Sequence, residues 1–109
     1  MRALRDGRLL RGVAERVLAR LPPGRLALLS TSPEGAALAA VCATRRHAPT
    51  SWQLIHLAYP PSMPVSQRVV VLEPIDPGHG WQAAVRRYYP NAVLLFAQTI
   101  ETPATRIAA

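Results

Sequence analysis

The sequence contains no lysine, so all 13 of its Lys or Arg positions are arginine. Only 6 residues are acidic, and the formal net charge is +7 at pH 7. An arginine bias of this kind, in a chain rich in alanine and proline, mostly reflects GC-rich coding. Because a guanidinium group matches the geometry of phosphate oxygens, the charge still permits a phosphorylated ligand or nucleic acid as a partner.

Cysteine is almost absent as well. Cys42 is the only one, which excludes an intrachain disulfide and any metal site built from several cysteines. It lies in an alanine-rich apolar segment, so we expect a buried structural thiol and not a reactive one.

Long apolar runs are missing too. No run reaches the roughly 18 residues that a membrane-spanning helix needs, and the first residues lack the apolar stretch of a secretory signal. These absences predict a cytoplasmic location and no membrane partner. With 109 residues, half of them apolar, the chain is expected to form one domain, residues 1–109, around a hydrophobic core.

Hydrophobic periodicity predicts helices and strands in the order α-β-α-β-β-α-β. The expected helices are residues 2–21, 34–46 and 80–89, and the expected strands are residues 25–29, 52–57, 69–72 and 92–99. Residues 59–67 read as a loop and residues 100–109 as a loose tail. Apolar strands interleaved with helices predict an α/β fold with a mainly parallel four-stranded sheet and helices on both faces.

Residues 1–24 are expected to form a basic amphipathic helix that ends at the "LPPG" turn. One side of this helix is apolar and carries Leu10, Val13, Ala14, Val17 and Leu21; the other carries Arg2, Arg5, Arg8, Arg11, Arg16 and Arg20. Such a face is either simply solvated or contacts a phosphate-rich surface or an acidic partner. No aromatic residues are interleaved with the arginines, which disfavours stacking on single-stranded nucleic acid.

Two loops follow predicted parallel strands and lead directly into helices, at residues 30–35 and 73–80. Ligands of open parallel sheets bind beyond the carboxyl ends of the strands. The N-terminus of a helix offers free N–H groups and a favourable dipole to an anion. Both loops are therefore candidates for holding a phosphate, the first through Ser30, Thr31 and Ser32.

The second loop has the more distinctive composition. Gly78 and Gly80 allow the backbone to approach a ligand closely, and His79 between them can donate to a phosphate. Glu73 and Asp76 are suited to accept hydrogen bonds from sugar hydroxyls or to coordinate magnesium. The alternative is an ordinary strand-to-helix connection, because glycine and proline make turns and acids are common where helices start.

The segment "VVVLEPIDPGHG", residues 69–80, resembles the ribose-phosphate-binding motif of type I phosphoribosyltransferases. That motif is a hydrophobic strand, usually two acids, and a Thr/Gly-rich loop that opens a helix. The uracil-specific branch has an Asp-Pro pair, to which Glu73-Pro74 is similar. The segment "LALLSTSPEGAALAAVCA", residues 26–43, resembles the family's first core strand, pyrophosphate-binding loop and small-residue helix.

The resemblance implies a Rossmann-like core with phosphoribosyl pyrophosphate and magnesium as ligand and cofactor. The residues that it places in the ligand site are Glu73, Asp76, Gly78, His79, Gly80, Ser30, Thr31 and Ser32. It assigns no catalytic residue and no metal ligand from the protein itself.

Three departures from the family pattern bear on activity. The usual threonines are replaced around Pro77 to Gly80, residues 58–67 are too few for the long catalytic loop, and no room follows Thr99 for the base-binding hood. We therefore expect a domain that binds a sugar phosphate or nucleotide without the full transfer machinery. Any phosphoribosyl transfer would depend on a partner subunit that supplies the missing parts.

Other functions remain open. "GHGWQA", residues 78–83, fits the G-x-G-x-x-A dinucleotide pattern with Glu101 about twenty residues on, but Glu73 to Pro77 separate the glycines from the strand. A methyltransferase with Glu73 on a cofactor ribose is no better supported, and no Ser-His-acid spacing favours a hydrolase. A non-catalytic interaction protein, such as a homodimer that keeps the fold without the ligand, is the main alternative, with nucleic-acid binding through the arginine face as a third.

Overall fold

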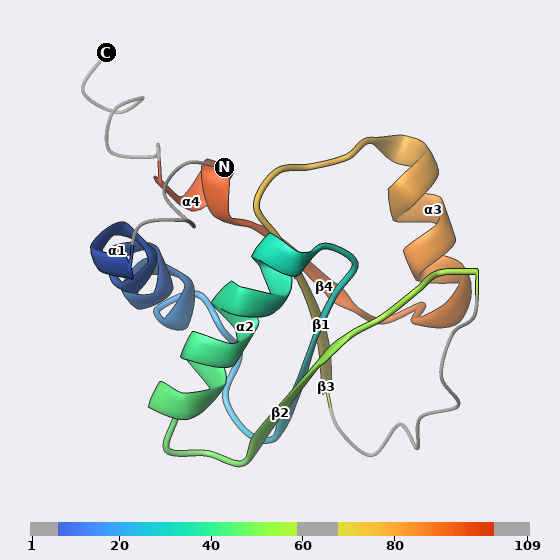
Figure 1. Ribbon diagram of the computed structural model, residues 1–109. Coiled ribbons are helices and arrows are strands. Elements are labelled where there is room, and N and C mark those ends of the chain that lie inside the picture. The colour runs from blue at the N-terminus through green and yellow to red at the C-terminus, as the bar shows by residue number, and fades with distance from the viewer. Residues whose placement is uncertain (1–6, 59–67, 102–109) are drawn as a thin grey trace.

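Four short strands form a single sheet in which every neighbouring pair is parallel. The computed structural model describes residues 7–58 and 68–101. The strand order is β2-β1-β3-β4 (Figure 1), and the strands are β1 (Leu26–Ser30), β2 (Thr50–Leu54), β3 (Arg68–Glu73) and β4 (Val93–Phe96). The predicted α/β architecture with a mainly parallel four-stranded sheet is confirmed.

Helices cover both faces of this sheet (Figure 1). They are α1 (Gly7–Leu18), α2 (Pro33–Arg45), α3 (His79–Tyr88) and α4 (Ala97–Glu101). Helices α1, α2 and α4 share one hydrophobic cluster with the sheet, and α3 shares the other. No helix in residues 7–58 and 68–101 is both long and apolar enough to cross a membrane.

Alternate side chains of the two central strands build the two clusters. Leu26 and Leu28 of β1 pack toward α1 and α2, whereas Ala27 and Leu29 belong to the cluster under α3. Successive side chains of a strand point to opposite faces, and both faces are buried here. This is why the central strands read as continuous apolar runs and not as alternating ones.

Helix α1 has the amphipathic character that its sequence predicts. Val13, Ala14 and Val17 are buried, and Arg11 and Arg16 are exposed. The helix ends at Leu18, three residues before the predicted end, and residues 2–6 of the prediction lie outside the described residues. Nucleic-acid binding through this face stays a prediction.

The predicted ends of two strands are wrong. Residues 97–99, expected to continue the fourth strand, belong to α4, because Ala97 and Ile100 turn into the cluster shared with α1. The loose tail therefore does not begin at residue 100. β2 covers Thr50–Leu54 and so begins two residues before the predicted strand of residues 52–57. Pairing with β1 fixes its register and therefore its bounds. The loop expected at residues 59–67 lies outside the described residues.

Candidate functional site

The carboxyl ends of β1 and β3 lie side by side in the middle of the sheet. From β1 the chain continues through α2 to β2 on one side, and from β3 it continues through α3 to β4 on the other. Two neighbouring strands whose connections diverge in this way form a topological switch point, where open α/β sheets bind their ligands. The two loops singled out in the sequence flank this point.

Glu73 lies buried at the centre of the first group of predicted site residues, with 2% of its surface exposed. Its carboxylate accepts a hydrogen bond from the Ser32 hydroxyl at 3.0 Å. It also accepts from the Thr31 hydroxyl and from the Thr31 backbone N–H at 3.3 Å. The Ser30 hydroxyl donates to the Leu72 carbonyl at 2.7 Å. These bonds tie the loop after β1 to the end of β3.

The same cluster closes the N-terminus of α2. Ser32 is the N-cap, with φ −127° and ψ 150°, and Pro33 follows it at the start of the helix, which is a favourable residue pair for a helix start. The Ser32 hydroxyl accepts from the Gly35 N–H at 3.1 Å. Because Ser32 donates to Glu73 at the same time, its hydroxyl is already engaged on both sides.

Gly35 is required by the close approach of α2 to the end of β3. A Cβ atom at this position would lie 2.6 Å from the Leu72 carbonyl oxygen and closer still to the Glu73 carboxylate. Both distances are shorter than normal van der Waals contact, and the Leu72 carbonyl belongs to the backbone of β3, which cannot move aside as a side chain could. The small residue at the start of α2 thus makes room for the buried carboxylate.

Trp81 extends the cluster to the other loop. Its indole N–H donates to the Thr31 hydroxyl at 3.0 Å, and its ring lies against Phe96 of β4 with centroids 5.9 Å apart and planes tilted by 59°. Trp81 also packs against the cluster that contains Val85 and Tyr89, whereas Tyr88 is exposed. No short-range pattern indicates a partner 50 residues away.

Burial controls the ionisation of Glu73. Desolvation raises the pKa of its carboxyl above the ordinary value of 4.5, and the hydrogen bonds from Thr31 and Ser32 oppose that rise. Burial disfavours the charged form while donors to the carboxylate favour it. Desolvation is the larger of the two effects, so the Glu73 carboxyl ionises at a higher pH than an exposed glutamate does.

The second group of predicted site residues surrounds the N-terminus of α3 and is different in character. Asp76, His79 and Gly80 are exposed. Asp76 accepts from the Gly78 N–H at 2.9 Å and from the Gln82 side-chain amide at 2.8 Å. These two donors lower the pKa of the Asp76 carboxyl below 3.8, so Asp76 is ionised at neutral pH.

Gly78 is the N-cap of α3 and has the positive φ of 114°, a conformation that side chains rarely adopt. No side chain caps this helix, and its first turn contains no acid. A Cβ atom at Gly80 would meet nothing within 4 Å, so the space beside the first turn is open. The first-turn N–H groups of α3 therefore have no capping side chain, and the exposed Asp76 carboxylate lies beside this turn, bonded to Gly78 and Gln82.

A magnesium site does not fit these residues. No three side chains of His, Cys, Asp or Glu come together anywhere in the described part of the chain. Glu73 is buried with both oxygens accepting hydrogen bonds, and both oxygens of Asp76 are likewise engaged. A magnesium ion prefers carboxylate oxygens that are free to complete an octahedron with water or phosphate.

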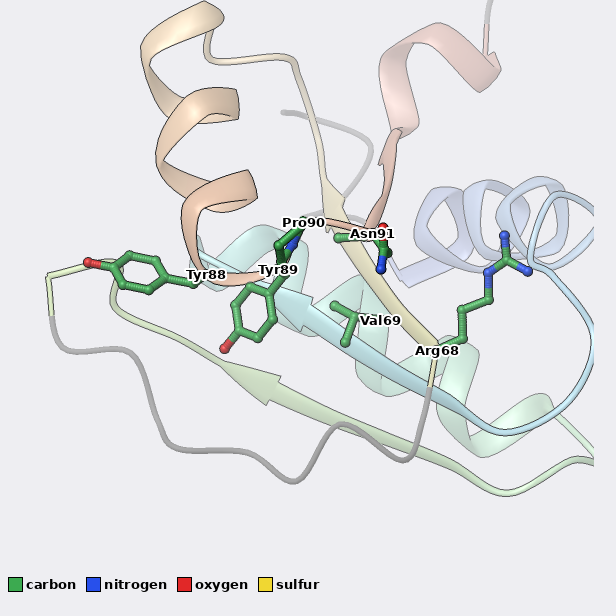
Figure 2. A pocket seen from close by; sticks show the side chains of 7 residues that line it. Arg68, Val69, Tyr88, Tyr89, Pro90 and Asn91 are labelled. Carbon is green, nitrogen blue, oxygen red and sulfur yellow. The ribbon is translucent and has the colours of Figure 1, made fainter.

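A hollow of about 330 Å³ lies at the opposite end of the sheet, where β3 and β4 begin. Its walls are formed by Arg68, Val69, Tyr88, Tyr89, Pro90, Asn91 and Ala92. Figure 2 shows the tyrosines at the end of α3 and Arg68 and Val69 at the start of β3. None of the predicted site residues lines it, and it is at the amino ends of the strands, where such sheets do not bind phosphates. The hollow therefore lies apart from the candidate site.

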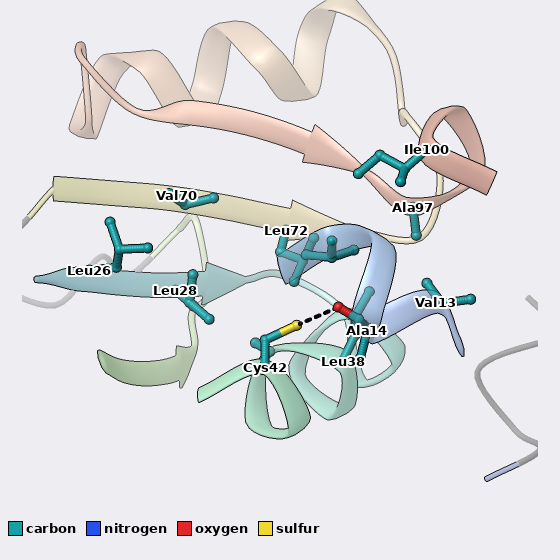
Figure 3. Close-up of a cluster of buried hydrophobic side chains, with 12 residues drawn as sticks. Val13, Ala14, Leu26, Leu28, Leu38, Cys42, Val70, Leu72, Ala97 and Ile100 are labelled. Atoms are coloured by element: carbon teal, nitrogen blue, oxygen red, sulfur yellow. Dashed lines mark hydrogen bonds between the residues drawn. The ribbon is translucent and has the colours of Figure 1, made fainter. Parts of the chain in front are cut away.

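Cys42 is excluded from chemistry by its position. The side chain is fully buried between α2 and α1, and its thiol points to the Ala14 carbonyl at 3.9 Å (Figure 3). Burial raises the pKa of the Cys42 thiol to about 12. Since the thiolate is the reactive form, the predicted structural role of this cysteine is confirmed.

The structure therefore divides the predicted site residues into two groups. Ser30, Thr31, Ser32 and Glu73 bond to one another, and Asp76, Gly78, His79 and Gly80 surround the N-terminus of α3. Between Glu73 and His79 the chain needs five residues, so the glycines of "GHGWQA" do not follow the strand directly as a dinucleotide fingerprint requires. Comparisons of the chain with protein-family models, curated proteins and solved structures find no match in any of the three.

Proposed function

We propose that the N-terminus of α3 and the loop before it bind the phosphate of a sugar phosphate or nucleotide. The observation that carries this proposal is the uncapped first turn of α3 at the switch point of the sheet. In an α-helix the first N–H groups have no intrahelical partner. The first intrahelical bond of α3 is donated by the Gln82 N–H to the Gly78 carbonyl at 3.1 Å.

The residues in front of Gln82 suit an oxyanion. His79, Gly80 and Trp81 supply the N–H groups of the first turn, and the helix dipole adds a partial positive charge at the same place. The exposed imidazole of His79 is a further donor. Gly78 and Gly80 keep Cβ atoms out of the way of a phosphate.

The first loop supports this site and does not hold the ligand itself. The hydroxyls of Thr31 and Ser32 donate to the Glu73 carboxyl group, which lies beside the N-terminus of α2 and leaves these hydroxyls engaged within the protein. Glu34 lies in the first turn of α2 and disfavours a phosphate there. Thr31 instead accepts from Trp81, which fixes the side chain that follows Gly80.

The resemblance to type I phosphoribosyltransferases supports a ribose phosphate as the ligand class. Asp76 is exposed and ionised, and a carboxylate oxygen that already accepts one hydrogen bond can accept a second one from a sugar hydroxyl. No side chain of the site is a nucleophile or a base with a partner, so the proposal is one of binding. Transfer chemistry would depend on a partner subunit.

A thermal-shift and calorimetric screen tests the proposal. Ribose 5-phosphate, a nucleoside monophosphate and phosphoribosyl pyrophosphate should each raise the melting temperature, because a ligand of the folded state stabilises it. Ribose without phosphate is the matched control and should have no effect. Magnesium should not be needed, since the protein contributes no magnesium site. No shift with any of the three phosphates at millimolar concentration would contradict the proposal.

A further inference from the structure

Strand β2 is an edge of the sheet with an exposed apolar surface. It pairs with β1 on one side, and no strand of the described residues pairs with its other side. Four large hydrophobic side chains of residues 7–58 and 68–101 are exposed, and two of them belong to this five-residue strand: Trp52 at 47% and Leu54 at 49%. The other edge strand, β4, has only half-buried residues.

The hydrogen bonds to β1 show which backbone groups of β2 face outward. The Leu26 N–H donates to the Pro49 carbonyl at 3.2 Å, and the Ile55 N–H donates to the Ser30 carbonyl at 2.7 Å. In a parallel ladder alternate residues of a strand direct both backbone groups to the same neighbour. With the register of β1 and β2, the odd-numbered residues of β2 face β1. The N–H and C=O groups of Thr50, Trp52 and Leu54 therefore point to the outer edge.

Nothing in β2 protects this edge. The sequence "TSWQL" has no charge and no proline, whereas edge strands of monomers are usually guarded by lysine, proline or a bulge. The strand also has β-branched and aromatic residues that favour pairing. An unguarded edge of this composition is suited to accept another strand.

We propose that the partner of this edge is β2 of a second copy of the chain, paired antiparallel about a two-fold axis at Trp52. A two-fold interface uses the same patch on both copies, and an antiparallel pair of identical strands has this symmetry. Trp52 then faces Trp52 of the second copy as a hydrogen-bonded pair, with Cα atoms about 5.5 Å apart. Thr50 faces Leu54 of the other copy, so each outward-pointing backbone group finds a partner.

The side chains fit the same arrangement. Trp52 is in register with Leu28, which packs toward α2, so Trp52 and Leu54 lie on the α2 face of the sheet. Across the two-fold axis both tryptophans and both leucines lie on one face, where cross-strand aromatic and aliphatic pairs stabilise a sheet. Apolar surface that is half exposed in the single chain becomes covered.

The α2 helices are also arranged favourably in this dimer. The axis runs perpendicular to the sheet, so the two α2 helices flank it in opposite directions on the same face. The N-terminal end of one α2 is therefore level with the C-terminal end of the other, and antiparallel helix dipoles attract each other. Arg45 in the last turn of α2 is paired with Glu15 of α1, so this contribution comes from the helix dipoles and not from an ion pair of Arg45. A second copy satisfies the backbone groups of the edge and covers its apolar side chains.

This dimer does not depend on phosphate binding, since β2 is separated from the N-terminus of α3 by β1 and β3. Its test is the mass of the full chain in solution by sedimentation equilibrium over a range of concentrations. We expect a species of twice the 11.9 kDa chain mass. The Trp52→Glu and Trp52→Arg variants should each be monomers, because like charges directly opposite in adjacent strands repel.

Mixing the two variants decides the geometry. Trp52→Glu and Trp52→Arg should form a heterodimer when combined, because only a two-fold pairing at residue 52 brings the introduced charges together. Ile75→Glu, which replaces an equally exposed residue (51%) outside β2, is the control and should remain a dimer. Circular dichroism verifies that each variant is folded. A wild-type monomer at every concentration, a dimeric Trp52→Glu variant, or a mixture that stays monomeric would overturn the proposal.

Discussion

The two helices that start beside the switch point differ in how their N-termini are capped. That of α2 is closed: Ser32 caps it, Glu34 lies in its first turn, and the buried Glu73 carboxylate lies directly beside it. That of α3 has a glycine N-cap and no side-chain cap, and the acid of its loop, Asp76, is exposed and bonds to Gly78 and Gln82. Two loops that look equally suited to phosphate in the sequence thus have different roles. The first loop ties α2 to the end of β3, and the second leaves the first turn of α3 without a capping side chain.

The difference depends on where an acid lies and on what surrounds it. Glu73 is the last residue of β3, and its side chain turns inward onto the hydroxyls of the neighbouring loop. Asp76 lies three residues later and remains in solvent, bonded to the backbone of its own loop. The buried Glu73 side chain and the Ser32 cap occupy the N-terminus of α2, whereas no side chain caps the N-terminus of α3.

Among variants of these two helix starts, we expect the largest effect from Gly35→Ala, which disturbs the packing of the N-terminus of α2 against the end of β3. The added Cβ would overlap the Leu72 carbonyl at 2.6 Å and the Glu73 carboxylate, and overpacking against backbone should reduce the free energy of unfolding by about 3 kcal/mol. Urea denaturation measures this loss.

Gly80→Ala is the matched control at the N-terminus of α3. Its Cβ would meet nothing within 4 Å, and alanine is the better helix former, so this variant should gain about 0.5 kcal/mol. Equal effects of the two substitutions would show that the starts of α2 and α3 do not differ as described.

Removing the cap of α2 should have a smaller effect. Ser32→Ala deletes the acceptor of the Gly35 N–H and a donor to Glu73, which should cost about 1–2 kcal/mol of unfolding free energy. Ser32→Thr keeps the hydroxyl and should retain most of the stability in the same denaturation experiment. A Ser32→Ala variant as stable as the wild type would mean that the cap is not part of what holds α2.

The pKa values of the two acids are shifted in opposite directions, and we expect these shifts to have the smallest effect on stability. The pKa of Glu73 is raised above 4.5, so its contribution is fully present below pH 4.5 and is lost as the pH rises through the higher folded value. The pKa of Asp76 is lowered below 3.8, so its contribution is present above pH 3.8 and is lost as the pH falls through the lower folded value.

Carbon-13 NMR of the side-chain carboxyls measures both pKa values directly. A Glu73→Gln variant should lose the part of the pH dependence of stability that lies above pH 4.5, while an Asp76→Asn variant keeps it. Titration of Glu73 below its ordinary pKa would contradict the description of the buried cluster.

Much of the fold follows from local sequence. The apolar runs predict the parallel strands, and Ser32-Pro33 predicts the start of α2 because capping is a local property. The inward direction of Glu73 could not be predicted, since its partners Thr31 and Ser32 are 42 and 41 residues away. The helix at Ala97–Glu101 was missed for the same reason: Ala97 and Ile100 join a cluster with α1, a contact that no local periodicity encodes.

We expect the N-terminus of α3 to bind phosphate and the N-terminus of α2 not to bind it. A nitrogen-15 NMR titration with ribose 5-phosphate tests this expectation residue by residue. We expect the amide signals of His79, Gly80 and Trp81 to shift with a saturable curve, while those of Glu34 and Gly35 stay in place. His79→Asp, which gives α3 the acidic first turn that α2 has, should abolish the shifts. Shifts confined to the α2 loop, or an unchanged titration in His79→Asp, would contradict phosphate binding at the N-terminus of α3.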